Sequence, residues 1–180
     1  MSVRSSRMSR ASERGFSLIE LGIVIAVIAV LASVVIVGRG FINSSRTGKA
    51  AEALSTIRKA GAVYTSNMTV QSPSSEIDAL QRRDLLPRTA ADPQGANATW
   101  TMTGSGTTAF KVTNVMFGQI GNGWGVFITV VTPEITMAED LVKLVSADPN
   151  FKDGGQVANQ NCQSIAAKVT TQNVNLCFKL

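Results

Sequence analysis

One apolar segment near the amino terminus constrains this 180-residue chain more than any other feature. Residues 16–37 contain 18 hydrophobic side chains among 22, and Glu20 is the only ionisable one. As a helix rising about 1.5 Å per residue, the segment would reach about 33 Å, more than the ~30 Å hydrocarbon core of a bilayer. A helix in a soluble core seldom runs this long without a polar face. The sequence therefore predicts a membrane-inserted helix.

The positive charge of the chain is concentrated before this segment. Residues 1–15 carry four arginines and one acidic residue, Glu13, and so supply +3 of the net charge of +5. A basic surplus is typical of nucleic-acid-binding proteins, but the rest of the chain has 13 basic and 11 acidic residues and is nearly neutral. A nucleic-acid-binding membrane protein stays an alternative; we expect nucleic-acid binding to be absent or indirect.

Two ordinary explanations of the apolar segment compete with a specialised one. A cleavable secretory signal has an apolar region of about 7–15 residues and a small-residue cleavage site, whereas here Arg39 and Phe41 follow directly. A plain signal anchor accounts for the length, and the upstream arginines favour a cytoplasmic amino terminus, although Arg39, Arg46 and Lys49 weaken that bias. Neither explains Glu20, because a carboxylate in hydrocarbon costs about 2.5 kcal/mol or more unless it stays wet near the headgroups.

Residues 14–20, Arg-Gly-Phe-Ser-Leu-Ile-Glu, resemble the class III signal of type IV pilins and related pseudopilins. In that family a short basic leader ends in Gly, the mature chain begins with an apolar residue, and Glu stands fifth. The resemblance implies that prepilin peptidase cuts between Gly15 and Phe16 and methylates the new amine of Phe16. A like-for-like stagger of helices would then bring Glu20 to the Phe16 amine of a neighbouring subunit, where the buried charge pair sets the register.

The helical pattern continues beyond the apolar segment. Apolar or small residues recur at steps of 4, 3, 4, 3 and 4 from position 50 to position 68, which predicts one helix over about 16–70 with an amphipathic second half. Glycines at 38, 40 and 48 could allow a bend. We expect a cleaved leader over 1–15, a transmembrane and polymerisation helix over 16–40, and a globular head over 41–180. The stripe consists of Ala50, Leu54, Ile57, Gly61, Tyr64 and Met68.

The remaining sequence predicts an α+β head. Runs rich in Thr, Val, Phe and Trp at 98–103, 109–117 and 124–132, and a last run at 175–180, predict antiparallel strands, with a hairpin turn at 121–123. Short helices are expected over 75–85 and 136–146, and a helix or turn over 163–168. Trp100 and Trp124 are expected in the core. The whole resembles the type IV pilin fold, a long amino-terminal helix packed on an antiparallel sheet with short inserted helices.

The chain has two cysteines, Cys162 and Cys177, and no histidine. Two cysteines without histidine do not make a zinc site, and Asp148 and Asp153 are too sparse for a confident calcium site, so we expect no metal and no cofactor. In an exported protein a disulfide is the default, with two unpaired core cysteines as the alternative. The pair also resembles the disulfide-bounded surface loop of pilins, here 163–176. Without histidine or a GxSxG motif, an enzyme is not expected.

The resemblance implies a structural subunit of a type IV pilus (fimbrium), inserted once in the inner membrane with its amino terminus inside and then assembled into an extracellular filament. Its partners would be identical subunits, prepilin peptidase and the inner-membrane assembly machinery. A pseudopilin of a type II secretion system, a class that often lacks the disulfide, and a minor priming pilin are the alternatives. The short helices and leader length resemble type IVb pilins and Phe16 resembles type IVa. Adhesion, motility, DNA uptake and mating all use such fibres.

Overall fold

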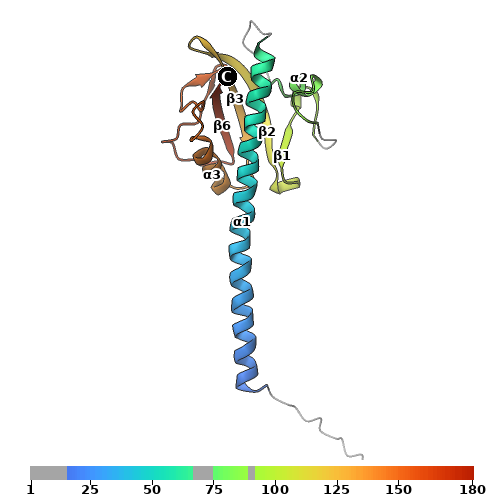
Figure 1. Ribbon diagram of the computed structural model, residues 1–180, viewed down its shortest axis with the longest axis vertical. Helices are drawn as coiled ribbons and strands as arrows, with labels where there is room; N and C mark the ends of the chain where they lie inside the picture. Colours follow the sequence, from blue (N-terminus) through green and yellow to red (C-terminus); the bar gives the residue numbers. More distant parts are fainter. Residues whose placement is uncertain (1–15, 67–74, 89–91) are drawn as a thin grey trace, which may run out of the picture. The chain divides into compact units, whose positions relative to one another are not determined.

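The computed structural model describes residues 16–66, 75–88 and 92–180 (Figure 1). The chain divides into two compact units, one ending at Phe41 and the other spanning Ile42–Leu180. The helix α1, Leu18–Thr65, has its first part in one unit and its last part in the other. The second unit is an α+β head, which confirms the expected fold class and is consistent with the type IV pilin fold.

The first part of α1 is apolar and exposed. Its most hydrophobic 18-residue window has a mean hydropathy of 3.0, and none of that window is buried against the rest of the protein. By length and composition this helix can cross a membrane. It begins at Leu18 instead of the expected Phe16, because Ser17 takes the position before the first helical turn. The helix is continuous through Gly38, Gly40 and Gly48, and a bend there stays a prediction.

The second part of α1 packs on the head through the predicted stripe. Side chains of Ala50, Leu54, Ile57 and Tyr64 are buried, and Gly61 lies among them. Met68 and the expected helix end near Val70 lie outside the described residues. Tyr64 stacks at 5.4 Å from Phe117 of the sheet, with the rings tilted by 40°. The same stripe that the spacing predicted is therefore the face by which the helix joins the core.

The head is built on one four-stranded antiparallel sheet in the order β1-β2-β3-β6. The strands are β1 Trp100–Thr103, β2 Phe110–Ile120, β3 Gly123–Val131 and β6 Asn173–Lys179. All four lie within about three residues of the predicted runs. β2 and β3 are joined by the two-residue turn of Gly121 and Asn122, and Gly121 has a φ of 60°, which glycine adopts without strain.

The helices of the head cover one face of this sheet. Figure 1 shows α3, Ile135–Val145, beside β6, and α2, Ile77–Arg82, on the β1 side of α1. Both were predicted, α2 with longer bounds. Two short 3-10 helices, η1 Gly95–Asn97 and η2 Gly106–Thr108, flank β1, and the 163–168 segment forms a turn. Trp100 is buried in the main core and Trp124 is half-buried against it, as expected.

A bulge in β2 decides which of its side chains reach that core. The pairing passes from Val112 with Val130 to Asn114 with Thr129, so Thr113 is an extra residue in β2. Val112 and Val115 both join the main core, although strict alternation would place them on opposite faces. Beyond the bulge, Ser75 and Glu76 take over the edge of β2: the Glu76 amide donates to the Val115 carbonyl at 2.8 Å. The sequence pattern did not indicate the bulge.

The opposite face of the sheet carries a second, smaller core. A hairpin of β4, Gln156–Val157, and β5, Gln160–Asn161, covers it, and its turn residues Ala158 and Asn159 have φ values of 52° and 61°. This hairpin was not predicted, because two-residue strands are too short to show an alternating pattern. The members of the second core are Met116, Phe127, Val157, Ala158 and Cys177.

Candidate functional site

Ser17 and Glu20 cap the amino-terminal end of α1 reciprocally. The Ser17 amide donates to Oε2 of Glu20 at 2.9 Å, and the Glu20 amide donates to Oγ of Ser17 at 3.2 Å. This is a capping box, which satisfies two of the amide groups that a helix leaves without carbonyl partners at its start. The carboxylate also lies in the first turn, where the helix dipole favours negative charge. Glu20 therefore has a local partner within a single chain.

The residues around the expected cleavage point flank this cap. Phe16 immediately precedes Ser17, and its side chain is 83% exposed. Gly15 lies outside the described residues, so the expected cleavage between Gly15 and Phe16 stays a prediction. The same holds for methylation of Phe16 and for the pairing of Glu20 with a neighbouring subunit. In the single chain, Glu20 already caps the helix end one turn after the expected new terminus, by accepting the hydrogen bond from the Ser17 amide.

The first part of α1 presents large apolar side chains in every direction. Leu18 is 89% exposed, and the side chains of the following turns, from Ile19 to Val37, are exposed as well. Soluble monomers seldom expose apolar surface on this scale, and such surfaces mark contact with a membrane or with another protein. Lipid or other copies of the helix would cover it. The surface is therefore the main candidate for assembly.

A disulfide joins Cys162 to Cys177, with their Cα atoms 5.7 Å apart. Cys177 lies in β6 and is buried in the second core, while Cys162 directly follows β5. The bond therefore fastens the β4–β5 hairpin to the outer face of the sheet. It also bounds the 163–176 loop. That loop is held further by Asp153, whose Oδ1 accepts a hydrogen bond from the Ile165 amide at 2.7 Å.

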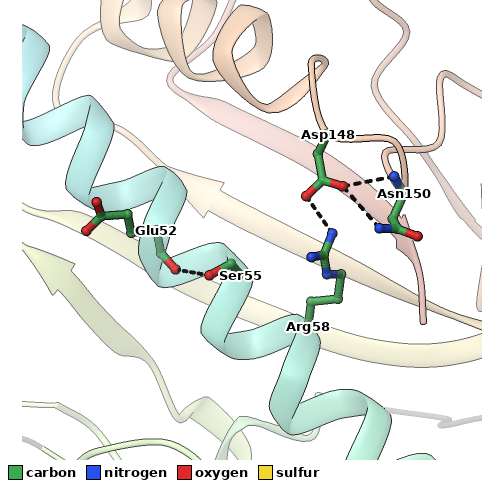
Figure 2. Close-up of polar contacts among 5 residues, drawn as sticks. All are labelled: Glu52, Ser55, Arg58, Asp148 and Asn150. Carbon is green, nitrogen blue, oxygen red and sulfur yellow. Dashed lines mark hydrogen bonds and ion pairs between the residues drawn. The ribbon is translucent and has the colours of Figure 1, made fainter.

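Among the described residues of the head, Arg58 and Asp148 form a long-range ion pair that the sequence did not predict. Arg58 of α1 pairs with Asp148, which follows α3, and Oδ1 of Asp148 also accepts from the backbone amide of Asn150 at 2.8 Å (Figure 2). Partial burial by itself would raise the pKa of Asp148, but the Asn150 amide and the Arg58 guanidinium outweigh it and hold that pKa below its ordinary value. The two residues lie too far apart in the chain for any local pattern to link them.

A second polar cluster lies at the carboxyl-terminal end of α1. The Tyr64 hydroxyl donates to Oε2 of Glu76 at 2.9 Å, and the Arg83 guanidinium lies 4.8 Å from the centre of the Tyr64 ring. Burial raises the pKa of Tyr64, and the hydrogen bond and negative charge of Glu76 raise it further, against the opposing charge of Arg83. Both clusters attach α1 to segments that follow it in the chain. They serve the fold of the head.

The acidic residues considered for calcium are engaged in other contacts. Asp148 is held by Arg58 and Asn150, and Asp153 accepts from the Ile165 amide. Within residues 16–66, 75–88 and 92–180, no group of three or more His, Cys, Asp or Glu side chains is placed to hold a metal ion. Asp148 and Asp153 therefore stabilise contacts within the head.

Comparison with known families identifies the amino-terminal segment. Residues 10–36 match the family model described as the prokaryotic N-terminal methylation motif. Searches of curated proteins and of solved structures found no significant match. The matched residues contain the basic end of the leader, the capping box and most of the exposed apolar helix. This chain therefore carries the class III signal peptide of type IV pilins, ahead of an α+β head that is consistent with the type IV pilin fold.

Proposed function

We propose that the chain is the precursor of a structural subunit of a type IV pilus. The methylation motif supports a pilin-like or pseudopilin precursor. The observation that carries the finer proposal is the pairing of that motif with a long apolar helix whose hydrophobic window is wholly exposed in the single chain. Lipid would cover this surface before assembly, and identical helices would cover it in the filament core. The proposed role is structural, and the methylation motif supports it because that motif points to a structural subunit.

In this proposal, prepilin peptidase removes residues 1–15 and methylates the amine of Phe16. Glu20 then has two roles in succession. In the membrane monomer it caps α1 together with Ser17, which keeps the carboxylate hydrogen-bonded. In the filament it pairs with the Phe16 amine of a neighbour, and burial of the pair in the helical core makes a correctly processed partner a requirement. The local cap explains how the carboxylate is held before a neighbour arrives.

The proposed arrangement has three segments: the leader over 1–15, the transmembrane and polymerisation helix over 16–40, and the head over 41–180. The four arginines of the leader favour a cytoplasmic amino terminus, and with that orientation the head would lie on the far side of the inner membrane. From there the assembly machinery would move the subunit into an extracellular filament. The disulfide agrees with folding of the head in an oxidising compartment.

Two related functions compete with this one. A pseudopilin of a type II secretion system carries the same signal, and a minor pilin would prime or cap the fibre. The Cys162–Cys177 disulfide favours a pilus subunit, because pseudopilins often lack one. Glu20 favours a subunit that packs within the fibre core.

The test is electron microscopy of fibres sheared from cells, with mass spectrometry of their main component. We expect abundant fibres whose subunit begins with N-methyl-Phe16. A Gly15→Leu variant is the matched control and should accumulate uncleaved in the membrane without fibres. Abundant fibres from uncleaved protein, or the absence of this chain from surface fibres, would contradict the proposal.

A further inference from the structure

A surface pocket of about 170 Å³ lies between the head part of α1 and the end of β6. Its walls carry three cationic side chains, of which two come from α1 and one from β6. The Lys179 amide donates to the Asn150 carbonyl at 2.8 Å, which fixes the β6 side of the pocket. The lining residues are Arg58, Lys59, Ala62, Asn150, Lys179 and Leu180.

Two of these cations have no acidic partner among the described residues of the head. Arg58 is occupied by Asp148. Lys59 and Lys179 are exposed, and the ion pairs formed among the described residues, Arg58 with Asp148 and Arg82 with Asp78, include neither lysine. The pocket therefore presents two lysine ammonium groups at a concave position beside Leu180, and ammonium groups attract a carboxylate.

The same head carries exposed carboxylates at a different height along α1. Glu139 and Asp140 are adjacent and exposed on α3. Asp140 lines a groove of about 420 Å³ together with Lys143 of α3 and with Ser44 and Thr47 of α1, and no ion pair joins Asp140 to Lys143 among the described residues. Lys59 follows these α1 residues by 12 to 15 positions, a distance of about 18–22 Å along a helix. The acidic site and the cationic pocket of one chain are thus too far apart to meet.

We infer that the Lys59–Lys179 pocket of one subunit binds the Asp140 and Glu139 carboxylates of a second copy displaced by about 20 Å along α1. This inference rests on the proposed function, because a filament of parallel copies, each shifted along α1 and rotated about the fibre axis, would be needed to bring the two sites together. Two different surfaces that meet in this way form a heterologous contact, which repeats without closing and builds a helical filament.

A copy of the same chain fits this pocket better than a nucleic acid does. A nucleic-acid surface is a basic stripe that follows several phosphates. Here the free positive charge is limited to two lysines, and Asp148 neutralises the neighbouring Arg58. The proposed ion pairs between the lysines of the pocket and the carboxylates of the second copy are exposed, and salt screens exposed ion pairs. Fibre stability should therefore fall as ionic strength rises.

Charge reversal and its rescue test the contact in the full-length chain. Lys59→Glu and Asp140→Lys should each lower the yield of sheared fibres by about tenfold or more, which corresponds to about 1.4 kcal/mol per subunit. The combined variant should restore most of the yield. Arg88→Glu is the matched control, because Arg88 is exposed outside the pocket, and it should leave the yield unchanged. Leader cleavage and membrane abundance, followed by immunoblot, should stay normal in all four.

Chemical cross-linking of wild-type fibres gives an independent readout. A carbodiimide joins Nζ of a lysine to a carboxyl carbon with loss of water, and we expect a Lys59–Asp140 or Lys59–Glu139 link by mass spectrometry. Normal fibres from both single variants, or no rescue in the combined variant, would overturn the inference. So would unchanged fibres that lose DNA retention in Lys59→Glu, since the pocket would then be a nucleic-acid site. If the wild-type chain makes no fibres, the proposed function itself fails, and this inference with it.

Discussion

Arg58 and Asp148 are 90 residues apart in the chain and form an ion pair across the head, between α1 and the segment after α3 (Figure 2). Both side chains are about three-quarters buried, and Asn150 supplies two further hydrogen bonds to the same carboxylate. The pair therefore ties the helix that carries the assembly segment to the carboxyl-terminal half of the head. Removing one partner would leave the other with an unmatched charge.

Asp148→Asn should destabilise the head by about 1–2 kcal/mol, because a charge-assisted hydrogen bond is lost. The urea midpoint, followed by the fluorescence of Trp100 and Trp124, should fall. Because the pKa of Asp148 is lower in the folded state, the stabilisation is present at neutral pH. This stabilisation should be lost as the pH falls below about 3.9, the pKa of Asp148 in the unfolded state, and then through its lower pKa in the folded state.

The matched control for this variant is Glu52→Gln. Glu52 is exposed on α1 about 1.7 turns before Arg58, and its side chain forms none of the ion pairs found among the described residues. Its midpoint should match that of the wild type. Equal acid sensitivity of the Asp148→Asn variant and the wild type would contradict the role assigned to the pair.

Gly61→Ala and Gly48→Ala should change stability in opposite directions. A Cβ at Gly61 would lie 2.7 Å from Cε1 of the buried Phe117 ring, whereas a Cβ at Gly48 meets nothing within 4 Å. Overpacking a core costs about 1–3 kcal/mol, and alanine gains up to about 1 kcal/mol over glycine at a helix position with room for the methyl group. Urea unfolding should show both shifts, and stabilisation by Gly61→Ala would contradict the close packing.

The Cys162→Ala/Cys177→Ala variant should lose about 3 kcal/mol of stability, since the bond closes a loop with a separation of 15 residues. The loss of stability should be concentrated on the face of the sheet that carries the second core. We expect faster hydrogen exchange in the β4–β5 hairpin, with β2 and β3 still protected. Reductant should lower the urea midpoint of the wild type and leave the variant unchanged. An equal midpoint with and without reductant would rule out a stabilising bond.

Glu20→Gln separates the local role of Glu20 from its proposed role in assembly. Glutamine also completes a capping box but carries no charge. The variant should insert and be cleaved normally. Fibre yield should nevertheless fall by about tenfold or more, because the Phe16 amine of the neighbouring subunit would be buried without its partner, and an unpaired buried charge costs about 3–5 kcal/mol. Ser17→Ala is the control that weakens the cap and keeps the charge. Normal fibres from Glu20→Gln would show that capping is sufficient.

Most of the secondary structure could be predicted because it depends on short-range patterns. The stripe from Ala50 to Tyr64 has a helical period, and the runs that became β2 and β3 are rich in Thr, Val, Phe and Trp and are separated by a glycine-containing turn. The bulge at Thr113 could not be predicted, because it depends on how β2 pairs with β3. The bulge allows Val112 and Val115 to reach the same core. The β4–β5 hairpin is too short to show a period, and it is held by a disulfide to a distant strand.

The amino-terminal segment of this protein could be interpreted from its amino-acid order alone. Insertion of residues 16–37 depends on the sum of their transfer free energies, and the methylation motif is read along the chain, so neither requires a fold. The contact of Arg58 with Asp148 depends on the folded head, as do the contact of Glu76 with Tyr64 and the pocket that Lys59 and Lys179 share. These contacts join residues far apart in the chain, and packing of the whole head on α1 places them.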